Sequence, residues 1–557
     1  MKKLISLVLV LMLLLTFAVG CQDDTTTTAA PGGDDTTTTT TKDDGGEDTT
    51  EPSEGGSDYA EPIQVSMNVM NAEKNGNHAR NEYIKEKFNL TFEYVPVSWG
   101  DWNEKIRTWI ATDDAPDLIW WDLKGATAYE YKSWARQGAF SGITEEKLGD
   151  RANLLEVYNN AASIDALSVD GTLYSWPSLR DNPPEAQNCY TSHWSYRRDW
   201  AKEVGLYKEG DIYTFEEWRE LIRAVLEQDP GENGAANAGL VMPTWAFPHA
   251  PVLFISAPAA EGNETCSYIK DDSGQYIWPA ATEDYKRGVE LTHEMYTEGL
   301  IYQDNMVFSG TESEDMTKSG LAFATYNVTG SLNDWTTQMI TDGVIEQRED
   351  FGIAIVSGWD GTWYMTQTED YWTVTALSHK ISDEATQRVF DFWDYLKTDE
   401  GILLRSYGVP GIDYNKTGDG LTDIELLWEY NEETETYVNP YTNVHEFNEA
   451  NGSENGRTVL GPGTIMYQYE ERDRLWNTFA NGDVKSAIKP FDFYVAFGSA
   501  PNKDQYGTFN IEAKEKMTQL IAMPADTDVG ALWQEWVDSM MPTVQLVLDE
   551  LNSGALE

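Results

Sequence analysis

Hydrophobic residues between positions 62 and 121 follow two alternating periods. Apolar side chains at every second position predict strands, whereas apolar side chains three and four positions apart predict amphipathic helices. In chain order we expect a strand at 63–69, a helix at 77–88, an extended segment at 90–97, a helix from Asp101 and a strand at 118–121. This alternation is the opening of a doubly wound parallel sheet.

Two pairs of residues have the spacing of a capping box. In this motif the side chain of the N-cap residue and that of an acid three positions later each accept a hydrogen bond from the backbone N–H of the other residue. The two pairs are Asp101 with Glu104, and Thr214 with Glu217. The helix that begins at Thr214 carries an apolar stripe that ends at Val225. Further along we expect a strand at 371–376 and a helix at 383–397.

The chain has 557 residues, more than one hydrophobic core usually serves, so we expect two packed lobes. Aromatic residues make up 12% of the sequence and include 21 Trp and 29 Tyr. This content exceeds what packing requires, and it predicts an aromatic surface that stacks against a ligand.

The formal net charge is −55 at pH 7. Such a chain repels phosphate backbones, and no cluster of Lys and Arg interrupts the acidic sequence, so nucleic acid is excluded as a partner. The same charge disfavours contact with an anionic membrane surface. It leaves an anionic substrate open, since a local Arg or Lys can invert the field inside a cleft, and solubility of an exported protein explains the acidity by itself.

The N-terminus is typical of an exported lipoprotein. A basic start is followed by an apolar run at 4–17, which is too short for a comfortable membrane span. The run ends in Ala-Val-Gly-Cys21, which resembles a bacterial lipobox with Ala in place of the usual Leu. We expect residues 1–20 to be a signal peptide and Cys21 to be lipidated, with plain secretion and a retained signal anchor as the alternatives.

Residues 21–61 are mostly Thr, Asp, Gly, Glu and Pro, with almost no apolar side chains after Cys21. Such a segment cannot bury enough surface to offset its chain entropy, so we expect a disordered, acidic tether. The other two cysteines, Cys189 and Cys266, have no metal-type spacing. We interpret them as structural, either bonded to each other or buried as thiols.

Six motifs in a fixed order resemble those of bacterial ABC-transporter extracellular solute-binding proteins of family 1. They are Ala115-Pro116-Asp117-Leu118, the segment DGTLYSWP at 170–177, YRRDW at 196–200 with Val204-Gly205-Leu206, the helix from Thr214, Gly320-Leu321-Ala322-Phe323, and Thr398-Asp399-Glu400-Gly401 with Tyr407-Gly408. The resemblance runs from Cys21 to about residue 415, and the remainder of the chain carries little that matches.

The resemblance implies an α/β, two-lobed periplasmic-binding-protein-like fold of type II, with doubly wound sheets and an interlobe cleft. On that basis we assign 62–180 and about 371–410 to lobe I, and about 181–370 to lobe II. The C-terminal part, 411–557, is expected to pack on both lobes.

The resemblance also implies a function: the lobes close on an oligosaccharide, expected to be neutral, and deliver it to an ABC permease without catalysis. The protein would be a monomer on the outer face of the cell membrane, held by the lipid on Cys21. Ligands of open α/β sheets sit beyond the carboxyl ends of strands, and sugar rings stack on aromatic side chains. The expected ligand contacts are Trp99, Trp120, Trp121, Asp122, Trp176, Arg198, Trp245, Phe247, Tyr326, Asn327, Trp359, Trp363 and Trp372.

In many members of this family a calcium-like loop follows the helix that matches the Thr214 helix. Here the loop at 229–237 lacks the carboxylate at its third position and a later acid, so we prefer a plain turn. Asp229, Glu232, Asn233 and Asn237 could supply some calcium ligands. No other metal and no cofactor is expected.

Three other functions stay open at this stage. A surface lipoprotein could bind polysaccharide without a permease, and the cargo of an importer could instead be a peptide or an acidic glycan. A secreted glycoside hydrolase would need paired carboxylates in an aromatic cleft, but 94 acids make any single pair uninformative. The sequence has no GxSxG, P-loop or Cys/His cluster, and we expect no enzyme.

Overall fold

A computed structural model describes residues 59–554, with gaps at 76–77, 124–125, 181–191, 245, 248–249, 255–267, 309, 367–368, 433–435, 442–460, 490–512 and 514. The predicted signal peptide and all three cysteines lie outside the described residues. So does the predicted tether, except for its last three residues.

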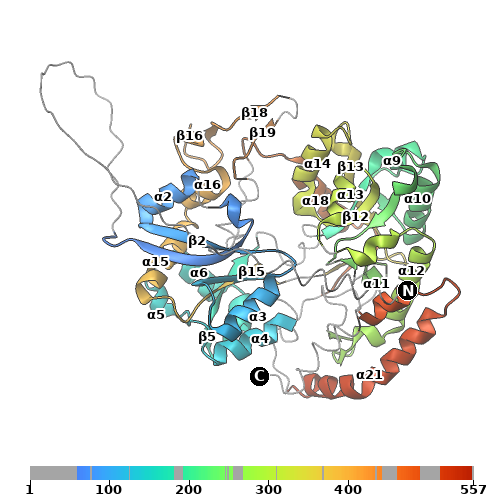
Figure 1. The fold of residues 1–557 in the computed structure, drawn as a ribbon, viewed down its shortest axis with the longest axis horizontal. Helices are drawn as coiled ribbons and strands as arrows, with labels where there is room; N and C mark the ends of the chain where they lie inside the picture. Colours follow the sequence, from blue (N-terminus) through green and yellow to red (C-terminus); the bar gives the residue numbers. More distant parts are fainter. Residues whose placement is uncertain are drawn as a thin grey trace, which may run out of the picture. The chain divides into compact units, whose positions relative to one another are not determined.

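The first sheet has five strands in the order β2-β1-β3-β15-β6 (Figure 1). They are β1 Ile63–Met70, β2 Leu90–Val97, β3 Leu118–Trp121, β6 Ser175–Leu179 and β15 Tyr371–Leu377. β1 pairs in parallel with β2 and β3, which confirms the predicted opening. β15 is antiparallel to β3 and β6, so the sheet is mixed rather than wholly parallel. We call the part of the chain built on this sheet lobe I.

Helices of lobe I pack around this sheet and share one hydrophobic core with it. They are α2 Ala79–Phe88, α3 Trp102–Thr112, α4 Ala126–Arg136, α5 Glu145–Leu148, α6 Ala152–Asn160, α7 Ser163–Leu167, α15 Asp383–Tyr395 and α16 Asp399–Tyr407, with the short strands β4 Ser168–Val169 and β5 Thr172–Leu173. The predicted helices at 77–88 and 383–397 are confirmed, each slightly shorter.

The capping box predicted at Asp101 is wrong, although the helix α3 is present. Asp101 accepts a hydrogen bond from the backbone N–H of Ser98, 2.7 Å away, and pairs with Lys105 at 2.9 Å. Its backbone is already helical, so its carboxylate does not reach the free N–H groups of the first turn.

The second sheet also has five strands, in the order β8-β13-β7-β12-β9. They are β7 Ser192–Arg197, β8 Ile212–Tyr213, β9 Ala238–Val241, β12 Ala322–Val328 and β13 Phe351–Val356. β7 runs antiparallel to β12 and β13, while the outer pairs, β12 with β9 and β13 with β8, are parallel. We call the part of the chain built on this sheet lobe II.

Helices of lobe II surround its sheet. They are α9 Arg198–Glu203, α10 Phe215–Gln228, α11 Ala250–Leu253, α12 Glu283–Thr297, α13 Glu312–Lys318 and α14 Leu332–Thr341, with the short hairpin β10 Ile269–Lys270 and β11 Tyr276–Ile277. The capping box at Thr214 is confirmed: its hydroxyl accepts from the N–H of Glu217, whose carboxylate accepts from the N–H of Thr214. The buried stripe of α10 ends at Val225, as predicted.

Segments after residue 410 pack on elements of both lobes. The hairpin of β16 Tyr414–Lys416 and β17 Ile424–Leu426 packs on α16, and β18 Tyr430–Asn431 pairs with β19 Thr436–Tyr437. α18 Tyr467–Ala480 covers β13, β20 Ser486–Lys489 pairs with β14 Trp363–Thr366, and α21 Val529–Asn552 lies along α12. The domain boundaries drawn from the sequence stay predictions.

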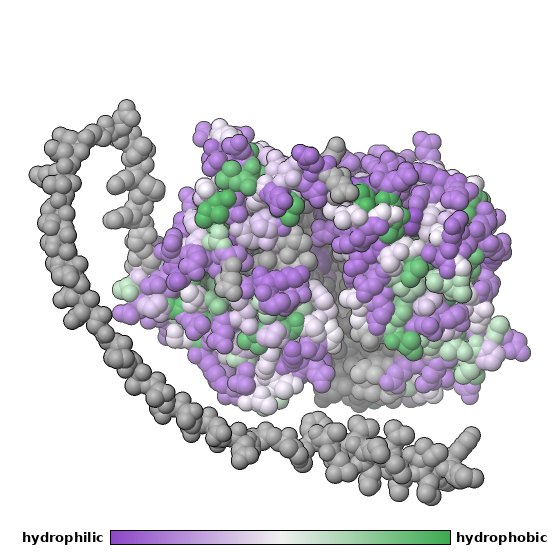
Figure 2. Space-filling view, turned by 45° about the horizontal axis from the view of Figure 1, so that its top comes forward, coloured by the Kyte–Doolittle hydropathy of each residue, from purple (hydrophilic) through white to green (hydrophobic). Residues whose placement is uncertain are grey.

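Hydrophilic residues cover most of the described surface on the face in Figure 2, where hydrophobic residues form small separate patches. In the part of the chain that the structure describes, no helix combines the length and apolarity needed to cross a bilayer.

Candidate functional site

One edge of the first sheet gathers residues from distant parts of the chain. β2 and β3 run in the same direction, and β15 runs against β3. The residues that follow β2 and β3 therefore lie at the same edge as the residues with which β15 begins. This geometry places Trp99, Asp122 and Trp372 at the carboxyl edge of lobe I, where ligands of α/β sheets bind.

Trp99 and Trp372 offer aromatic surface at this edge. Their ring centroids lie 6.2 Å apart with planes inclined by 31°. Trp99 is 60% exposed, which is unusual for so large an apolar side chain, and Trp372 is partly exposed. We call the exposed faces of these two indoles the aromatic surface. Two rings of this kind can stack against the apolar C–H faces of a sugar.

Two buried tryptophans support the aromatic surface from beneath. Trp102 of α3 stacks on Trp120 of β3 with centroids 3.8 Å apart, and Trp99 contacts both rings edge-on. The indole N–H of Trp102 donates to the carbonyl of Trp120, 2.9 Å away. The buried amide of Asn68 bonds both the N–H and the C=O of Trp120. These bonds hold the end of β3 in place, so that the ring of Trp120 supports Trp99.

The roles predicted for Trp120, Trp121 and Trp176 as ligand contacts need correction. All three side chains are buried in the core of lobe I and leave no ring face open to a solute. Trp121 packs against Tyr131, and Trp176 packs near Trp393 of α15. The strand at 118–121 is covered on both faces, so its two tryptophans are core residues even though the strand ends at the site edge.

Arg198 also has a structural role instead of the predicted ligand contact. Its guanidinium is buried and pairs with Asp211 at 2.8 Å and with Glu471 at 2.7 Å. It also donates to the hydroxyl of Tyr467 at 2.8 Å, while Arg474 pairs with the same Glu471 at 2.8 Å. Every partner is inside lobe II or on α18, so the charge of Arg198 is already neutralised by protein groups.

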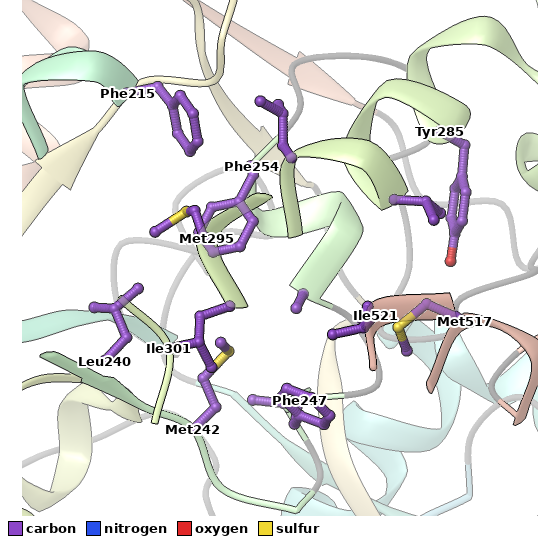
Figure 3. Packing of buried hydrophobic residues seen from close by; sticks show 14 of the residues in the cluster. Phe215, Leu240, Met242, Phe247, Phe254, Tyr285, Met295, Ile301, Met517 and Ile521 are labelled. Carbon is purple, nitrogen blue, oxygen red and sulfur yellow. The ribbon is translucent and has the colours of Figure 1, made fainter. Parts of the chain in front are cut away.

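Phe247 is a core residue of lobe II, which corrects its predicted contact with ligand. Its ring is buried and lies near Met242 in the cluster drawn in Figure 3. Tyr326, on β12, packs edge-on against Trp194 with centroids 5.2 Å apart, and burial raises the pKa of its phenol to about 12. Trp245 and the side chain of Asn327 lie outside the described residues.

The loop after β13 carries a second exposed tryptophan. Trp359 is 48% exposed and stands at the carboxyl edge of the second sheet, with its backbone N–H bonded to the carbonyl of Phe254. Trp363, four residues on, is buried between His193 and Phe479. Of this predicted pair, only Trp359 has a face open to a ligand.

The loop at 229–237 is a turn closed by its own first residue. The carboxylate of Asp229 accepts backbone N–H bonds from Asn233 at 3.0 Å and Gly234 at 2.7 Å, and the amide of Asn233 donates to Gly320. The side-chain amide of Asn237 donates to the carbonyl of Val225. Within the described residues no group of three or more His, Cys, Asp or Glu is arranged to hold a metal ion. The preference for a plain turn over calcium binding by Asp229, Glu232, Asn233 and Asn237 stays a prediction.

Sequence reasoning missed several residues of this edge. Trp102 lies in the predicted helix from Asp101, and Asn68 lies in the predicted strand at 63–69, but the sequence gives neither a role at a site. Glu369 and Asp370 precede β15 at the same edge as Asp122 and were not selected among 94 acids. Residues that precede an antiparallel strand lie at the carboxyl edge of the sheet. The sequence would have identified Glu369 and Asp370 as edge residues only if it had also shown the direction of β15.

No family model matches the chain. A curated relative is the polygalacturonan/rhamnogalacturonan-binding protein YtcQ of Bacillus subtilis (strain 168), 22% identical over 351 residues. The match covers 60% of this chain and 64% of YtcQ, which is less than two thirds of that relative's length.

Solved structures share the fold over nearly the whole chain. The alginate-binding protein AlgQ2, in a structure without calcium ion, gives a TM-score of 0.63 at 15% identity and covers 90% of this chain and 99% of its own. The Streptococcus pneumoniae ABC-transporter substrate-binding protein FusA, an EF-hand mutant in complex with fructo-nystose, gives 0.60 at 14% identity, covering 88% and 98%. An HMO-binding, ABC-transporter-associated solute-binding protein of Bifidobacterium longum infantis gives 0.57 at 14%, covering 88% and 97%. The chain has the two-lobed fold of these proteins, as predicted.

Proposed function

We propose that this chain is the extracytoplasmic solute-binding component of an ABC importer, and that it captures an oligosaccharide. The observation that carries the proposal is the aromatic surface formed by Trp99 and Trp372 at the carboxyl edge of lobe I. Exposing two indoles to water is unfavourable unless a ligand covers them in use. Sugar-binding proteins with this fold, such as FusA, support the same function.

The partners of the proposed function are a sugar and a pair of permease subunits. Closure of a two-lobed fold on its ligand is a hinge motion, and a closed form presents a different surface to a permease from an open form. We propose that the protein works as a monomer that neither cleaves nor modifies its ligand. The ATPase that drives import would act on the permease and not on this chain.

The membrane anchor belongs to the same proposal. Residues 1–20 would direct export, and a lipid on Cys21 would hold the protein at the outer face of the cell membrane through the acidic tether. Mass spectrometry of the N-terminal peptide from membrane fractions should find an acylated Cys21. Cys21→Ser should release the protein into the medium, whereas Cys189→Ser should stay with the membrane.

Binding is tested with the purified protein and a panel of oligosaccharides that differ in sugar, linkage and length. A ligand at 100 times its Kd stabilises the folded protein by about 2.7 kcal/mol, which raises the melting temperature measurably. Calorimetric titration then gives the Kd, and an assay for new reducing ends detects hydrolysis. Saturable binding without new reducing ends supports the proposal; release of reducing ends would show a glycoside hydrolase instead.

Transport is tested separately in cells. Deleting the gene should abolish uptake of the labelled oligosaccharide that the purified protein binds, and the wild-type gene should restore it. Unchanged uptake, together with loss of sugar from the cell surface, would identify a surface glycan-binding lipoprotein that has no permease.

A further inference from the structure

Two short hairpins after α16 expose apolar side chains to water. The hairpin of β16 and β17 packs on α16, and the hairpin of β18 and β19 packs against it through Tyr437. Four large apolar side chains in this part of the chain are exposed: Ile412, Leu427, Tyr430 and Val438. Exposed apolar side chains that gather in one place indicate a surface that binds a partner or a ligand.

Tyr430 of β18 and Tyr437 of β19 are the aromatic members of this surface. They are directly opposed across the two strands, with ring centroids 5.1 Å apart and planes inclined by 71°. Tyr437 is partly buried against the core of the first hairpin, whereas Tyr430 is 49% exposed. We call these two residues the tyrosine pair. Tyr430 therefore has an open ring face that an inner ring holds in place, as Trp99 has at the sheet edge.

Polar groups accompany the open face of Tyr430. In the part of the chain that the structure describes, neither phenol of the tyrosine pair has a hydrogen-bond partner. The exposed carboxylates of Glu429 and Glu432 flank Tyr430 along the chain. A phenol donates and accepts hydrogen bonds, and a carboxylate accepts them. An aromatic face next to such groups suits a sugar ring, which stacks through its C–H groups and needs partners for its hydroxyls.

The end of the second hairpin lies at the carboxyl edge of lobe I. The ring of Tyr441 is covered by the guanidinium of Arg80, whose Cζ lies 3.4 Å from the ring centroid, and it meets the ring of His78 edge-on. Both residues are at the start of α2. Because α2 ends at Phe88, two residues before β2 begins, its start lies at the opposite end of the strands, where the aromatic surface is. The hydroxyl of Tyr441 donates to Asp413 at 2.5 Å and so fixes the two hairpins to each other.

The tyrosine pair also borders a segment that crosses to lobe II. A Cβ on Gly463 would lie 2.5 Å from Leu426 and 3.6 Å from Tyr437, so the backbone of residues 461–466 touches both hairpins. Two residues later, the carbonyl of Ile465 accepts a hydrogen bond from the side chain of Asn333 in α14 at 2.7 Å. Ligand sites occur preferentially where domains adjoin, and a crossing segment marks such a place.

We infer that the tyrosine pair is an outer sugar subsite, and that the protein selects an oligosaccharide long enough to cover both the aromatic surface and Tyr430. The inference rests on the proposed function and adds the length of the ligand to it. A short sugar on Trp99 and Trp372 leaves Tyr430 in water. A longer one covers Tyr430 as well, and removing that ring from water adds to the affinity.

The test is a length series of the oligosaccharide that the purified protein binds, measured by calorimetric titration of the full mature chain. We expect the Kd to fall about fivefold or more once the ligand is long enough to reach Tyr430, and to change little with further sugars. An equal Kd for the shortest and the longest ligand would overturn this inference and leave the proposed function standing. Binding of no oligosaccharide at any length would overturn both.

Variants of Tyr430 locate the effect. Tyr430→Ala should weaken binding of the longest ligand about fivefold or more and leave the shortest unaffected. Tyr430→Phe keeps the ring face and should retain most of the gain with length. Val307→Ala, which changes an exposed apolar residue of η7 Gln303–Val307 in lobe II, is the control and should bind both ligands as wild type does. Melting curves and the affinity for the shortest ligand show that each variant folds.

Two results for Tyr430→Ala would contradict the outer subsite. An equal loss for short and long ligands would place Tyr430 in the same subsite as the aromatic surface. Wild-type affinity at every length would show that Tyr430 contacts no sugar, and reduced uptake by cells carrying that variant would then identify the hairpins as a docking surface for the permease.

Discussion

The ring centroids of Trp99 and Trp372 lie 6.2 Å apart; Trp99 packs edge-on against both members of the stacked pair Trp102 and Trp120, and Trp372 packs edge-on against Trp120. Trp99 follows β2 and Trp372 belongs to β15, so the pair exists only after the chain has returned to the first sheet. Solvent-exposed and buried indoles thus form one cluster in which the outer members have a free face and the inner members fix their position.

Replacing the outer indole should affect binding more than stability. Trp99→Ala removes an exposed ring, so we expect the Kd for the oligosaccharide to rise about tenfold or more, a loss of about 1.4 kcal/mol, with little change in melting temperature. Trp99→Phe keeps an aromatic face and should retain part of the affinity. Calorimetric titration and thermal unfolding measure the two effects.

Replacing an inner indole gives the matched contrast. Trp120→Ala leaves a cavity in the core of lobe I and should destabilise the protein by about 3–5 kcal/mol. Wild-type affinity in Trp99→Ala, or wild-type stability in Trp120→Ala, would show that the outer and inner roles are assigned incorrectly.

The buried ion network between lobe II and α18 predicts a large loss of stability when one acid is removed. Glu471→Gln leaves Arg198 and Arg474 with a single carboxylate, that of Asp211, so we expect a loss of about 3–5 kcal/mol in the free energy of unfolding. Chemical denaturation measures this loss. The Kd for ligand should change little in the folded fraction, because Arg198 is a structural residue.

The pH dependence of stability gives a second test of the ion network formed by Glu471, Arg198 and Arg474. Burial acts to raise the pKa of Glu471, but the charges of Arg474 and Arg198 outweigh it and lower that pKa. The carboxylate therefore contributes stability above the ordinary pKa of Glu, and this contribution is lost as the pH falls through the lower, folded-state value. Glu471→Gln should lack this part of the acid sensitivity, and an acid profile identical to wild type would contradict the assignment.

Gly352 is required because the guanidinium of Arg198 occupies the space of a side chain. A Cβ at this position of β13 would lie 2.0 Å from the Cζ of Arg198. Gly352→Ala should displace the guanidinium and destabilise lobe II by a few kcal/mol. Its effect should not add to that of Glu471→Gln, because both act on the same group. Gly100→Ala, which meets open space, is the control for melting temperature.

The burial of the Lys397 amine predicts that the free energy of unfolding rises with pH. Its Nζ is buried without a hydrogen-bond partner in the described structure, although its stem is partly exposed. Burial, with a smaller effect of Arg405, lowers its pKa to about 7. Between that value and the ordinary Lys pKa, the unfolded chain binds a proton that the folded chain does not, so the free energy of unfolding rises with pH across this window.

Lys397→Met should remove this dependence. The variant should melt above wild type near pH 7, by about 2 °C or more for each kcal/mol gained, and the difference should disappear as the pH approaches the ordinary Lys pKa. Melting curves across this pH range measure the difference. An advantage that grows with pH would contradict the burial of a neutral amine.

Local sequence pattern predicted the elements of the fold well because each depends on a short range of residues. The strand at 63–70 and the capped helix from Thr214 are fixed by period and spacing alone. The direction of β15 depends on its pairing with β3, hundreds of residues away, and no local pattern encodes it.

The site was harder to predict because exposure is decided by the fold. Trp99 and Trp121 are both loop-proximal tryptophans in the sequence, yet one is exposed and the other is covered on both faces of its strand. Arg198 finds Glu471 and Tyr467 on α18, in the part of the chain where no motif was recognised. The aromatic content predicted a stacking surface, but only the sheet edge identifies which rings can form it.

The most direct test of the central claim is a crystal structure of the mature protein with the oligosaccharide from the binding panel that binds tightest. We expect a sugar ring to lie flat against the indole of Trp99 or Trp372, at the van der Waals distance of about 4 Å. A sugar bound elsewhere, with both indoles left in water, would contradict the account.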